Sequence, residues 1–184
     1  MTTAPPLLPP LPAYDVRLAR VADVAGVCEV CREGFVESSR GLLPPATIEQ
    51  QAAAYYAPDR VLREVLSAGE DPRWQGYVVA VTAAGRVLGA AGGGVTPDGL
   101  GQVYVLYLDP ALRGRGVGTA LLDFVTAQQR SEGAAEQWVS VTDGNWMGIP
   151  FYPARGFVVR DRVPFTTTDR RPTGAHSLRM SRPV

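Results

Sequence analysis

A glycine-rich turn between a predicted strand and a predicted helix carries the residues best suited to chemistry. Residues 106–119 read Leu-Tyr-Leu-Asp-Pro-Ala-Leu-Arg-Gly-Arg-Gly-Val-Gly-Thr. Backbone N–H groups at the start of a helix have no partner within the helix, and the helix dipole adds partial positive charge there. Glycines let such a backbone approach a ligand closely. The turn is therefore suited to binding a phosphate or pyrophosphate group.

Two common phosphate-binding loops do not fit this turn. A Walker loop needs a lysine, and the chain contains none, which also excludes lysine Schiff-base chemistry. The dinucleotide fingerprint needs a third glycine where this chain has Leu121. What remains is Arg113-x-x-Gly116-x-Gly118, placed directly after a strand that is apolar on both faces.

The elements that must position this turn follow from the apolar periodicity of the chain. Asp23 is expected to cap the first helix, Thr47-x-x-Gln50 to form a capping box, and Gly92–Gly94 to mark a bulge or a close-packed neighbour. The predicted strands are 16–19, 77–82, 86–91, 103–108, 137–142, 157–165 and 177–181. The predicted helices are 24–35, 47–56, 60–68 and 117–133, with a short helix or turn over 145–153.

The predicted fold class is α/β (α+β), with a mixed sheet of six to seven strands and four to five helices on its faces. Residues 1–12 are rich in proline and are expected to form a disordered tail, followed by a single domain over 13–184. The two cysteines, Cys28 and Cys31, lie on the apolar side of the first helix, which favours a role in the core. No metal site is expected.

Composition narrows the classes of partner. The formal net charge is zero, so the basic excess typical of nucleic-acid binders is missing and no nucleic-acid partner is expected. No apolar run approaches the roughly 18 residues that span a bilayer, so no membrane partner is expected. Two cysteines without an export signal favour a cytoplasmic location. The oligomeric state stays open, with a homodimer as one option.

Two motifs together resemble a known family. Arg113-x-x-Gly116-x-Gly118 is similar to the acetyl-CoA motif of the GCN5-related N-acetyltransferase (GNAT) family, Arg/Gln-x-x-Gly-x-Gly/Ala. The segment 145–157, Asn-Trp-Met-Gly-Ile-Pro-Phe-Tyr-Pro-Ala-Arg-Gly-Phe, resembles that family's second signature. The segment 17–23 is similar to its opening strand and helix, so the resemblance covers roughly residues 14–182. The resemblance implies a GNAT fold with the mostly antiparallel sheet of that family. It also implies a bacterial protein.

The resemblance also implies roles for individual residues. The backbone of Leu106, Tyr107 and Leu108 would bind the pantetheine arm of acetyl-CoA, and Tyr152 would lie near its sulfur as the catalytic acid. Asn145 would contact the same co-substrate. The pyrophosphate would be held by the loop made of Arg113, Gly114, Arg115, Gly116, Val117, Gly118 and Thr119. A phenol with a pKa of about 10 is close enough to a thiol of about 8.5 for Tyr152 to donate a proton.

One expected group is missing. Many family members carry a glutamate on the central strand as general base, but residues 102–107 read Gln-Val-Tyr-Val-Leu-Tyr. Glu33, Glu37 and Asp143 remain as candidates, with a solvated helix face as the alternative for each of the two glutamates. The resemblance thus implies direct acetyl transfer to a primary amine of a small molecule or peptide in a ternary complex. A non-catalytic acyl-CoA-binding module and transfer to a hydroxyl are the alternatives.

Overall fold

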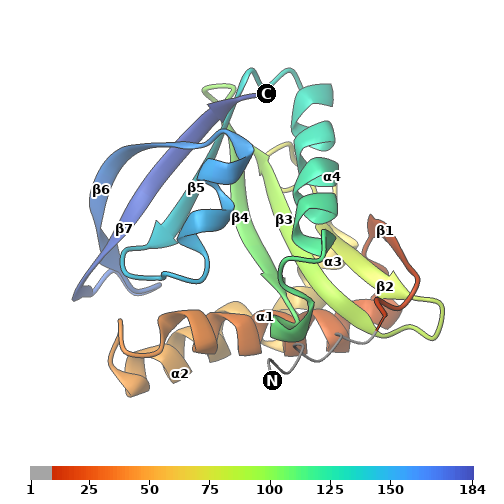
Figure 1. Cartoon of the computed structure of the whole chain (residues 1–184), viewed down its shortest axis with the longest axis horizontal. Coiled ribbons are helices and arrows are strands. Elements are labelled where there is room, and N and C mark those ends of the chain that lie inside the picture. Colours follow the sequence, from red (N-terminus) through yellow and green to blue (C-terminus); the bar gives the residue numbers. More distant parts are fainter. Residues whose placement is uncertain (1–9) are drawn as a thin grey trace, which may run out of the picture.

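The computed structural model describes residues 10–184, which form one seven-stranded sheet with helices on both faces (Figure 1). The spatial order is β1-β2-β3-β4-β5-β7-β6, and neighbours are antiparallel except β4 and β5, which are parallel. The strands are β1 Tyr14–Leu18, β2 Tyr77–Thr82, β3 Val87–Val95, β4 Gly101–Leu108, β5 Glu136–Thr142, β6 Val158–Thr166 and β7 Pro172–Pro183. The predicted mixed, mostly antiparallel sheet of six to seven strands is confirmed, and it has seven strands.

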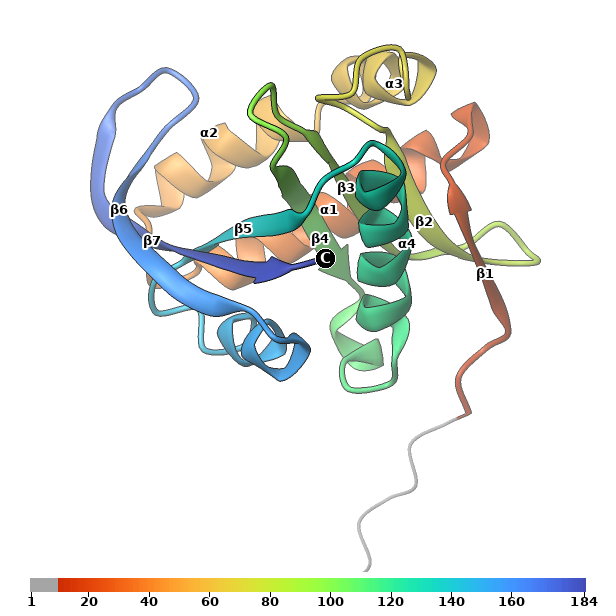
Figure 2. The same ribbon diagram turned by 90° about the horizontal axis from the view of Figure 1, so that it is seen from above.

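The helices divide between the two faces of the sheet (Figure 2). They are α1 Val24–Ser39, α2 Pro45–Tyr55, α3 Pro58–Leu66 and α4 Val117–Ser131. On one face α4 buries Leu121, Leu122 and Val125 against the sheet. On the other face α1 buries Val27 and Cys31 in a second cluster shared with α2 and α3. The core role predicted for the cysteine pair is confirmed for Cys31, which is fully buried.

Two predicted helix caps differ in the structure. The capping box at Thr47 and Gln50 is wrong, because α2 already begins at Pro45, whose fixed φ suits the first helical position. Asp23 does stand at the N-cap of α1, but its side chain makes no cap hydrogen bond there. Instead its carboxylate accepts from the Arg17 guanidinium at 2.7 Å and from the Arg20 amide at 2.7 Å. Asp23 therefore joins β1 to the helical segment that follows it.

The glycine run in β3 confirms the predicted bulge. The register between β3 and β4 shifts between Gly92 and Gly93. A Cβ atom on Gly92 would lie 2.7 Å from the Trp74 ring, and one on Gly94 would lie 2.1 Å from the Arg73 carbonyl oxygen. The glycines are needed because the segment before β2 packs directly on the backbone of β3.

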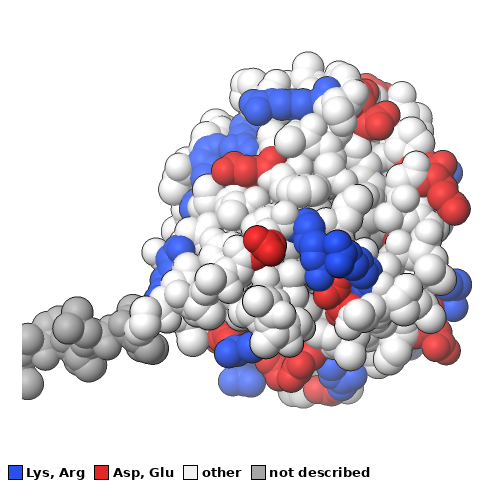
Figure 3. Space-filling model, turned by 90° about the vertical axis from the view of Figure 1, so that its right-hand side faces the viewer, with Lys and Arg blue, Asp and Glu red and all other residues white. Residues whose placement is uncertain are grey.

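The predicted disordered tail falls mostly on residues 1–9, which lie outside the described residues. Within residues 10–184, no helix is both long and apolar enough to cross a membrane. On the face shown in Figure 3, arginines and carboxylates are interspersed. That pattern agrees with the balanced charge of the sequence.

Candidate active site

The sheet opens between β4 and β5. The two strands pair only at three positions, where Gly101, Gln102 and Val103 face Gln137, Trp138 and Val139. Beyond Val103 the strands diverge, as Figure 1 shows. Among the described residues, the stretch 105–108 therefore pairs with β3 on one side and has no strand partner on the other. A gap of this kind leaves backbone donors and acceptors available to a ligand.

The direction of these backbone groups follows from the ladder with β3. The amide of Asp109 donates to the carbonyl oxygen of Leu88 at 2.9 Å, so Asp109 faces β3. Backbone groups alternate in direction along a strand, and the register is regular from Leu108 to Leu106. The amide and carbonyl groups of Leu106 and Leu108 therefore point into the gap, whereas those of Tyr107 face β3.

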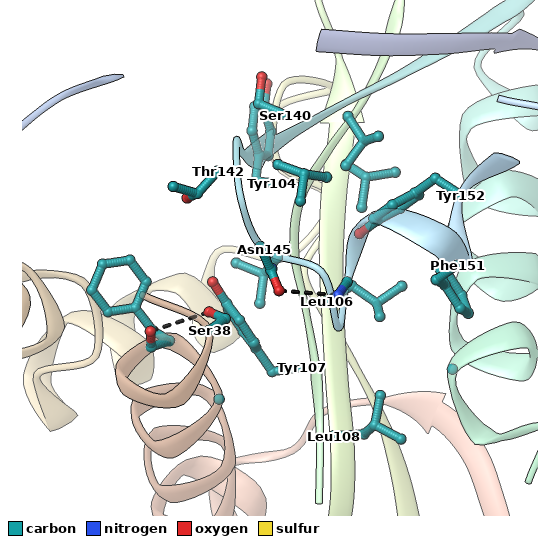
Figure 4. A pocket seen from close by; sticks show the side chains of 18 of the residues that line it. Ser38, Tyr104, Leu106, Tyr107, Leu108, Ser140, Thr142, Asn145, Phe151 and Tyr152 are labelled. Carbon is teal, nitrogen blue, oxygen red and sulfur yellow. Dashed lines mark hydrogen bonds between the residues drawn. The ribbon is translucent and has the colours of Figure 1, made fainter. Parts of the chain in front are cut away.

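The gap opens into a cavity of about 990 Å³. Figure 4 shows Tyr152, Asn145 and Leu106 around the same space. Most of the residues predicted for the co-substrate line this cavity: Leu106, Tyr107, Leu108, Arg113, Gly114, Gly116, Gly118, Thr119, Asn145 and Tyr152. Arg115 and Val117 are not among its lining residues, and the Val117 side chain is fully buried in the core. For Val117, only the backbone amide could serve a ligand.

The glycine turn runs into α4 in the conformation that the sequence predicts. Gly114 and Gly116 have φ values of 71° and 89°, a region that side chains with a Cβ rarely adopt. Gly116 is the N-cap of α4, and Ala120 donates to its carbonyl oxygen at 3.0 Å. The amides of Val117, Gly118 and Thr119 precede that first helical bond, so they belong to the first turn, whose donors have no acceptor within the helix.

Arg113 leads from this turn to the opposite wall. Its guanidinium contacts Glu37 on α1 at 3.0 Å and the Met147 sulfur at 3.1 Å. Both members of the ion pair are partly exposed. The Arg113 guanidinium, which the resemblance places in the pyrophosphate-binding loop, is thus held by a carboxylate on α1.

Arg155 is a pocket residue rather than a solvent-facing one. Its guanidinium lies 3.7 Å from the centre of the Phe151 ring and donates to the Phe151 carbonyl oxygen at 2.8 Å. It also donates to Thr119 Oγ1 at 3.1 Å. Partial burial lowers the pKa of Arg155, which nevertheless stays protonated. A second cation therefore stands beside the glycine turn.

Tyr152 stands on the wall opposite β4, between two short 3-10 helices, Ile149–Phe151 and Pro153–Arg155. Its ring makes edge contacts with Phe151 and Phe157, with centroids 5.1 and 5.4 Å apart. Figure 4 shows its hydroxyl directed into the cavity beside β4. Burial raises the pKa of Tyr152 above its usual value, so the phenol is neutral throughout the physiological range. The sequence suggested that the pKa of the Tyr152 phenol lies close to that of a thiol, and this match does not hold. Donation of a hydrogen bond is therefore the favoured role of Tyr152.

Asn145 caps the turn that carries Tyr152. Its Oδ1 accepts from the Gly148 amide at 3.0 Å (dashed in Figure 4). This bond leaves the amide nitrogen of the side chain to serve a ligand, since the residue also lines the cavity. Capping and ligand contact are therefore compatible at this position.

The other half of the cavity is aromatic, and no sequence motif pointed to it. Phe35 on α1 packs against Tyr55 and Tyr56 at the end of α2, with ring centroids 5.8 and 6.4 Å away. The Trp74 and Tyr104 rings lie 6.5 Å apart. Burial raises the pKa of Tyr56 and Tyr107, so both phenols are neutral. These residues come from separate elements, so only the folded chain brings them together.

None of the three predicted base candidates lines the cavity. Glu33 is exposed on α1, Glu37 is paired with Arg113, and the Asp143 carboxylate accepts from Arg162 at 2.7 Å. A different carboxylate, Glu64 on α3, does line it. No sequence pattern pointed to Glu64, because it lies far from both motifs and forms part of an ordinary helical charge pair with Arg60.

Comparison with known proteins gives a family match. The profile of the Acetyltransferase (GNAT) family matches residues 44–157. A mycothiol acetyltransferase from Saccharopolyspora erythraea is 32% identical over 77 residues, which are 42% of this chain and 25% of that protein. One from Geodermatophilus obscurus is 36% identical over 61 residues, which are 33% of this chain and 20% of that protein. The chain thus matches a quarter or less of the length of these relatives.

Solved structures resemble the fold over nearly the whole chain. The PaiA N-acetyltransferase from Thermoplasma acidophilum, in complex with coenzyme A, has a TM-score of 0.76 at 20% identity, covering 94% of this chain and 99% of that one. A GCN5-related N-acetyltransferase from Kribbella flavida has a TM-score of 0.65 at 25% identity, covering 94% and 98%. The family profile spans more than half of the chain. The chain therefore belongs to the acetyltransferase (GNAT) family.

Proposed function

We propose that this chain transfers the acetyl group of acetyl-CoA directly to the primary amine of a small molecule or peptide, with both substrates bound at once. One observation carries the proposal. The gap between β4 and β5 opens into the same cavity as the aromatic side chains of α1 and α2 and the charged side chains of α3. A ligand in the gap and a second ligand on the aromatic side would therefore meet without a covalent enzyme intermediate.

The residues present suit acetyl-CoA. In this proposal the backbone groups of Leu106 and Leu108 that point into the gap bind the pantetheine arm, which lies beside β4 in the place of a further strand. The amides of 114–119 and the Arg113 guanidinium bind the pyrophosphate. Arg155 is a further cation close to the same turn. Asn145 supplies a side-chain amide on the opposite wall.

When bound, acetyl-CoA supplies an activated acetyl group and a thiol leaving group. The chain's own residues supply the polar contacts. A backbone amide of Leu106 or Leu108 polarises the carbonyl group, because both point into the gap. The Tyr152 phenol, neutral and directed into the cavity, donates a hydrogen bond to the sulfur as negative charge develops there.

The aromatic half of the cavity, which would hold the acceptor, favours an amine attached to an apolar or aromatic group. Its walls are Phe35, Tyr55, Tyr56, Trp74 and Tyr104, and an ammonium group is attracted to the faces of such rings. Its described charged side chains, Arg60 and Glu64, neutralise each other at 2.8 Å. The pocket therefore lacks a net charge that would select a highly charged acceptor.

Release of free CoA tests the proposal. Purified protein is incubated with acetyl-CoA and matched pairs of acceptors, such as 2-phenylethylamine and 2-phenylethanol, and the free thiol is followed with a chromogenic reagent. We expect steady release with the amine alone. Release with the alcohol would favour the hydroxyl alternative. Binding of acetyl-CoA without release from any acceptor would favour the non-catalytic module.

A further inference from the structure

We propose that Glu64 on α3 receives the ammonium group of the acceptor and removes its proton. This inference rests on the proposed transfer to an amine. It assigns the general base that the central strand of this chain lacks, since residues 102–107 contain no carboxylate. The assignment follows from the lining of the cavity, the contacts of Glu64 and the chemistry of amines.

Acetyl transfer needs a proton acceptor. An alkylammonium group has a pKa of about 10, so only about one molecule in a thousand is neutral at pH 7. Among the described residues that line the cavity there is no aspartate, histidine or cysteine, and the arginines cannot accept a proton. The lining tyrosines Tyr56, Tyr107 and Tyr152 have raised pKa values and stay neutral. Glu64 is the one described carboxylate in the lining.

The Glu64 carboxylate is fixed and still has room for a ligand. One oxygen accepts from Arg60 Nε at 2.8 Å, and the other accepts from the Tyr77 hydroxyl at 3.0 Å. A carboxylate has about four lone-pair positions, so these two bonds leave others for a donor from the cavity. The side chain is 25% exposed, which shows that it is reachable.

Packing around Trp74 holds Glu64 at this place. The Trp74 indole N–H donates to the Glu64 carbonyl oxygen at 2.7 Å, which ties α3 to the segment before β2. The same ring lies against Gly92, where a Cβ would come within 2.7 Å of it. It also faces Tyr104 of β4. The glycine run of β3 thus lets Trp74 lie on the sheet and bring α3 to the edge of the cavity.

The titratable groups that face Glu64 come from three elements. Arg60 on α3 supplies a positive charge, Tyr77 on β2 donates a hydrogen bond, and Cys31 on α1 lies close enough to interact. Burial raises the pKa of both Tyr77 and Cys31, so these two groups are neutral. Arg60 forms an ion pair with the Glu64 carboxylate at 2.8 Å, which fixes the carboxylate at the edge of the cavity.

The proton balance closes with the residues already described. The ammonium gives one proton to Glu64, and the neutral nitrogen forms the N–C bond as the C–S bond breaks. Tyr152 donates a hydrogen bond to the leaving sulfur, and the thiolate takes up the proton that the nitrogen loses as it becomes an amide. Glu64 then releases its proton to solvent. The products are the acetylated amine, free CoA and one proton.

The variant Glu64→Gln tests this role, because glutamine keeps the size and the acceptor oxygen of the side chain but cannot take a proton. With 2-phenylethylamine as acceptor, we expect kcat/KM at pH 7 to fall about 100-fold. At pH 10 about half of the amine is already neutral, so the variant should come within about threefold of the wild type. The matched control is Glu33→Gln on the exposed surface of α1, which should behave as wild type at both pH values.

Several results would overturn the assignment. Full activity of Glu64→Gln at pH 7 would show that another group takes the proton. An equal loss at pH 7 and pH 10 would show that Glu64 only supports Arg60 and Tyr77. Calorimetry with acetyl-CoA should give the same affinity for wild type and variant, which checks that the variant is folded. A wild type that binds acetyl-CoA but acetylates no amine would overturn the proposed function together with this assignment.

Discussion

The Arg113 guanidinium and the Glu37 carboxylate lie 3.0 Å apart and join the glycine turn before α4 to α1. Arg113 is the first residue of the motif that the family uses for its co-substrate. In the structure it is held by a protein carboxylate. Binding of a pyrophosphate at the turn would therefore compete with Glu37 for the same cation.

Removing the Glu37 carboxylate should strengthen the binding of acetyl-CoA. Exposed ion pairs contribute about 0–1 kcal/mol, so Glu37→Gln is expected to tighten acetyl-CoA binding by no more than about fivefold. Arg113→Gln should weaken it by about tenfold, because a hydrogen bond to a charged group is worth about 1.5–3 kcal/mol. Isothermal titration at low ionic strength measures both effects. Weaker binding by Glu37→Gln would mean that the ion pair supports the site rather than competing with it.

The glycine turn allows a matched pair of variants. Gly116 and Gly133 stand at the two ends of α4 with φ values of 89° and 84°, and a Cβ atom added to either would meet no other atom within 4 Å. Valine at either position should cost similar stability, of the order of 1–3 kcal/mol. Only Gly116→Val should abolish acetyl-CoA binding, because its side chain would cover the amides of the turn. Comparable affinities of the two variants, measured by calorimetry, would argue against this turn as the pyrophosphate site.

Tyr152→Phe should separate turnover from binding. The ring keeps its edge contacts with Phe151 and Phe157, so the stability and the affinity for acetyl-CoA should change little. Loss of the donor to the leaving sulfur should lower kcat by about 100-fold. Steady-state kinetics and a thermal melt measure the two effects. Unchanged kcat would remove Tyr152 from the acid role.

The buried contact of Asp23 should make stability depend on pH in the acid range. Burial alone would raise the pKa of Asp23, but the hydrogen bonds from Arg17 and the Arg20 amide outweigh it and lower the pKa. A lowered folded pKa stabilises the fold above the unfolded value of 3.8, and this stability is lost as pH falls below it. Asp23→Asn should cost about 2–4 kcal/mol at pH 7, since it leaves Arg17 without its partner.

Thermal melts between pH 3 and pH 7 check this. The difference in stability between wild type and Asp23→Asn should shrink as pH falls below about 4, where the Asp23 carboxyl of the unfolded wild type takes up a proton before that of the folded state. A difference that stays constant over the whole range would mean that the charge of Asp23 does not contribute.

The sequence predicted those parts of the fold that depend on local patterns. Apolar periodicity located the strands and helices, and the spacing of Arg113, Gly116 and Gly118 located the turn before α4. The start of α2 was wrong because the proline pair 44–45 sets the first turn more strongly than a threonine side chain does. The glycines of β3 were correctly read as a bulge, but their neighbour Trp74 could not be named.

The acceptor half of the cavity could not be predicted from the sequence. Phe35, Tyr56, Glu64 and Tyr104 come from separate parts of the chain, and no spacing along it links them. The base candidates Glu33, Glu37 and Asp143 were chosen for their place near element ends. Side-chain direction and ion pairing decide their role, and both depend on tertiary contacts.

Amide hydrogen exchange with and without acetyl-CoA would show whether the open edge of β4 and the turn before α4 bind this co-substrate. We predict that the amides of Leu106, Leu108 and 114–119 become protected on binding. The amide of Tyr107, which already faces β3, should change little. If saturating acetyl-CoA left the exchange of all these amides unchanged, the co-substrate could not lie along this edge and turn.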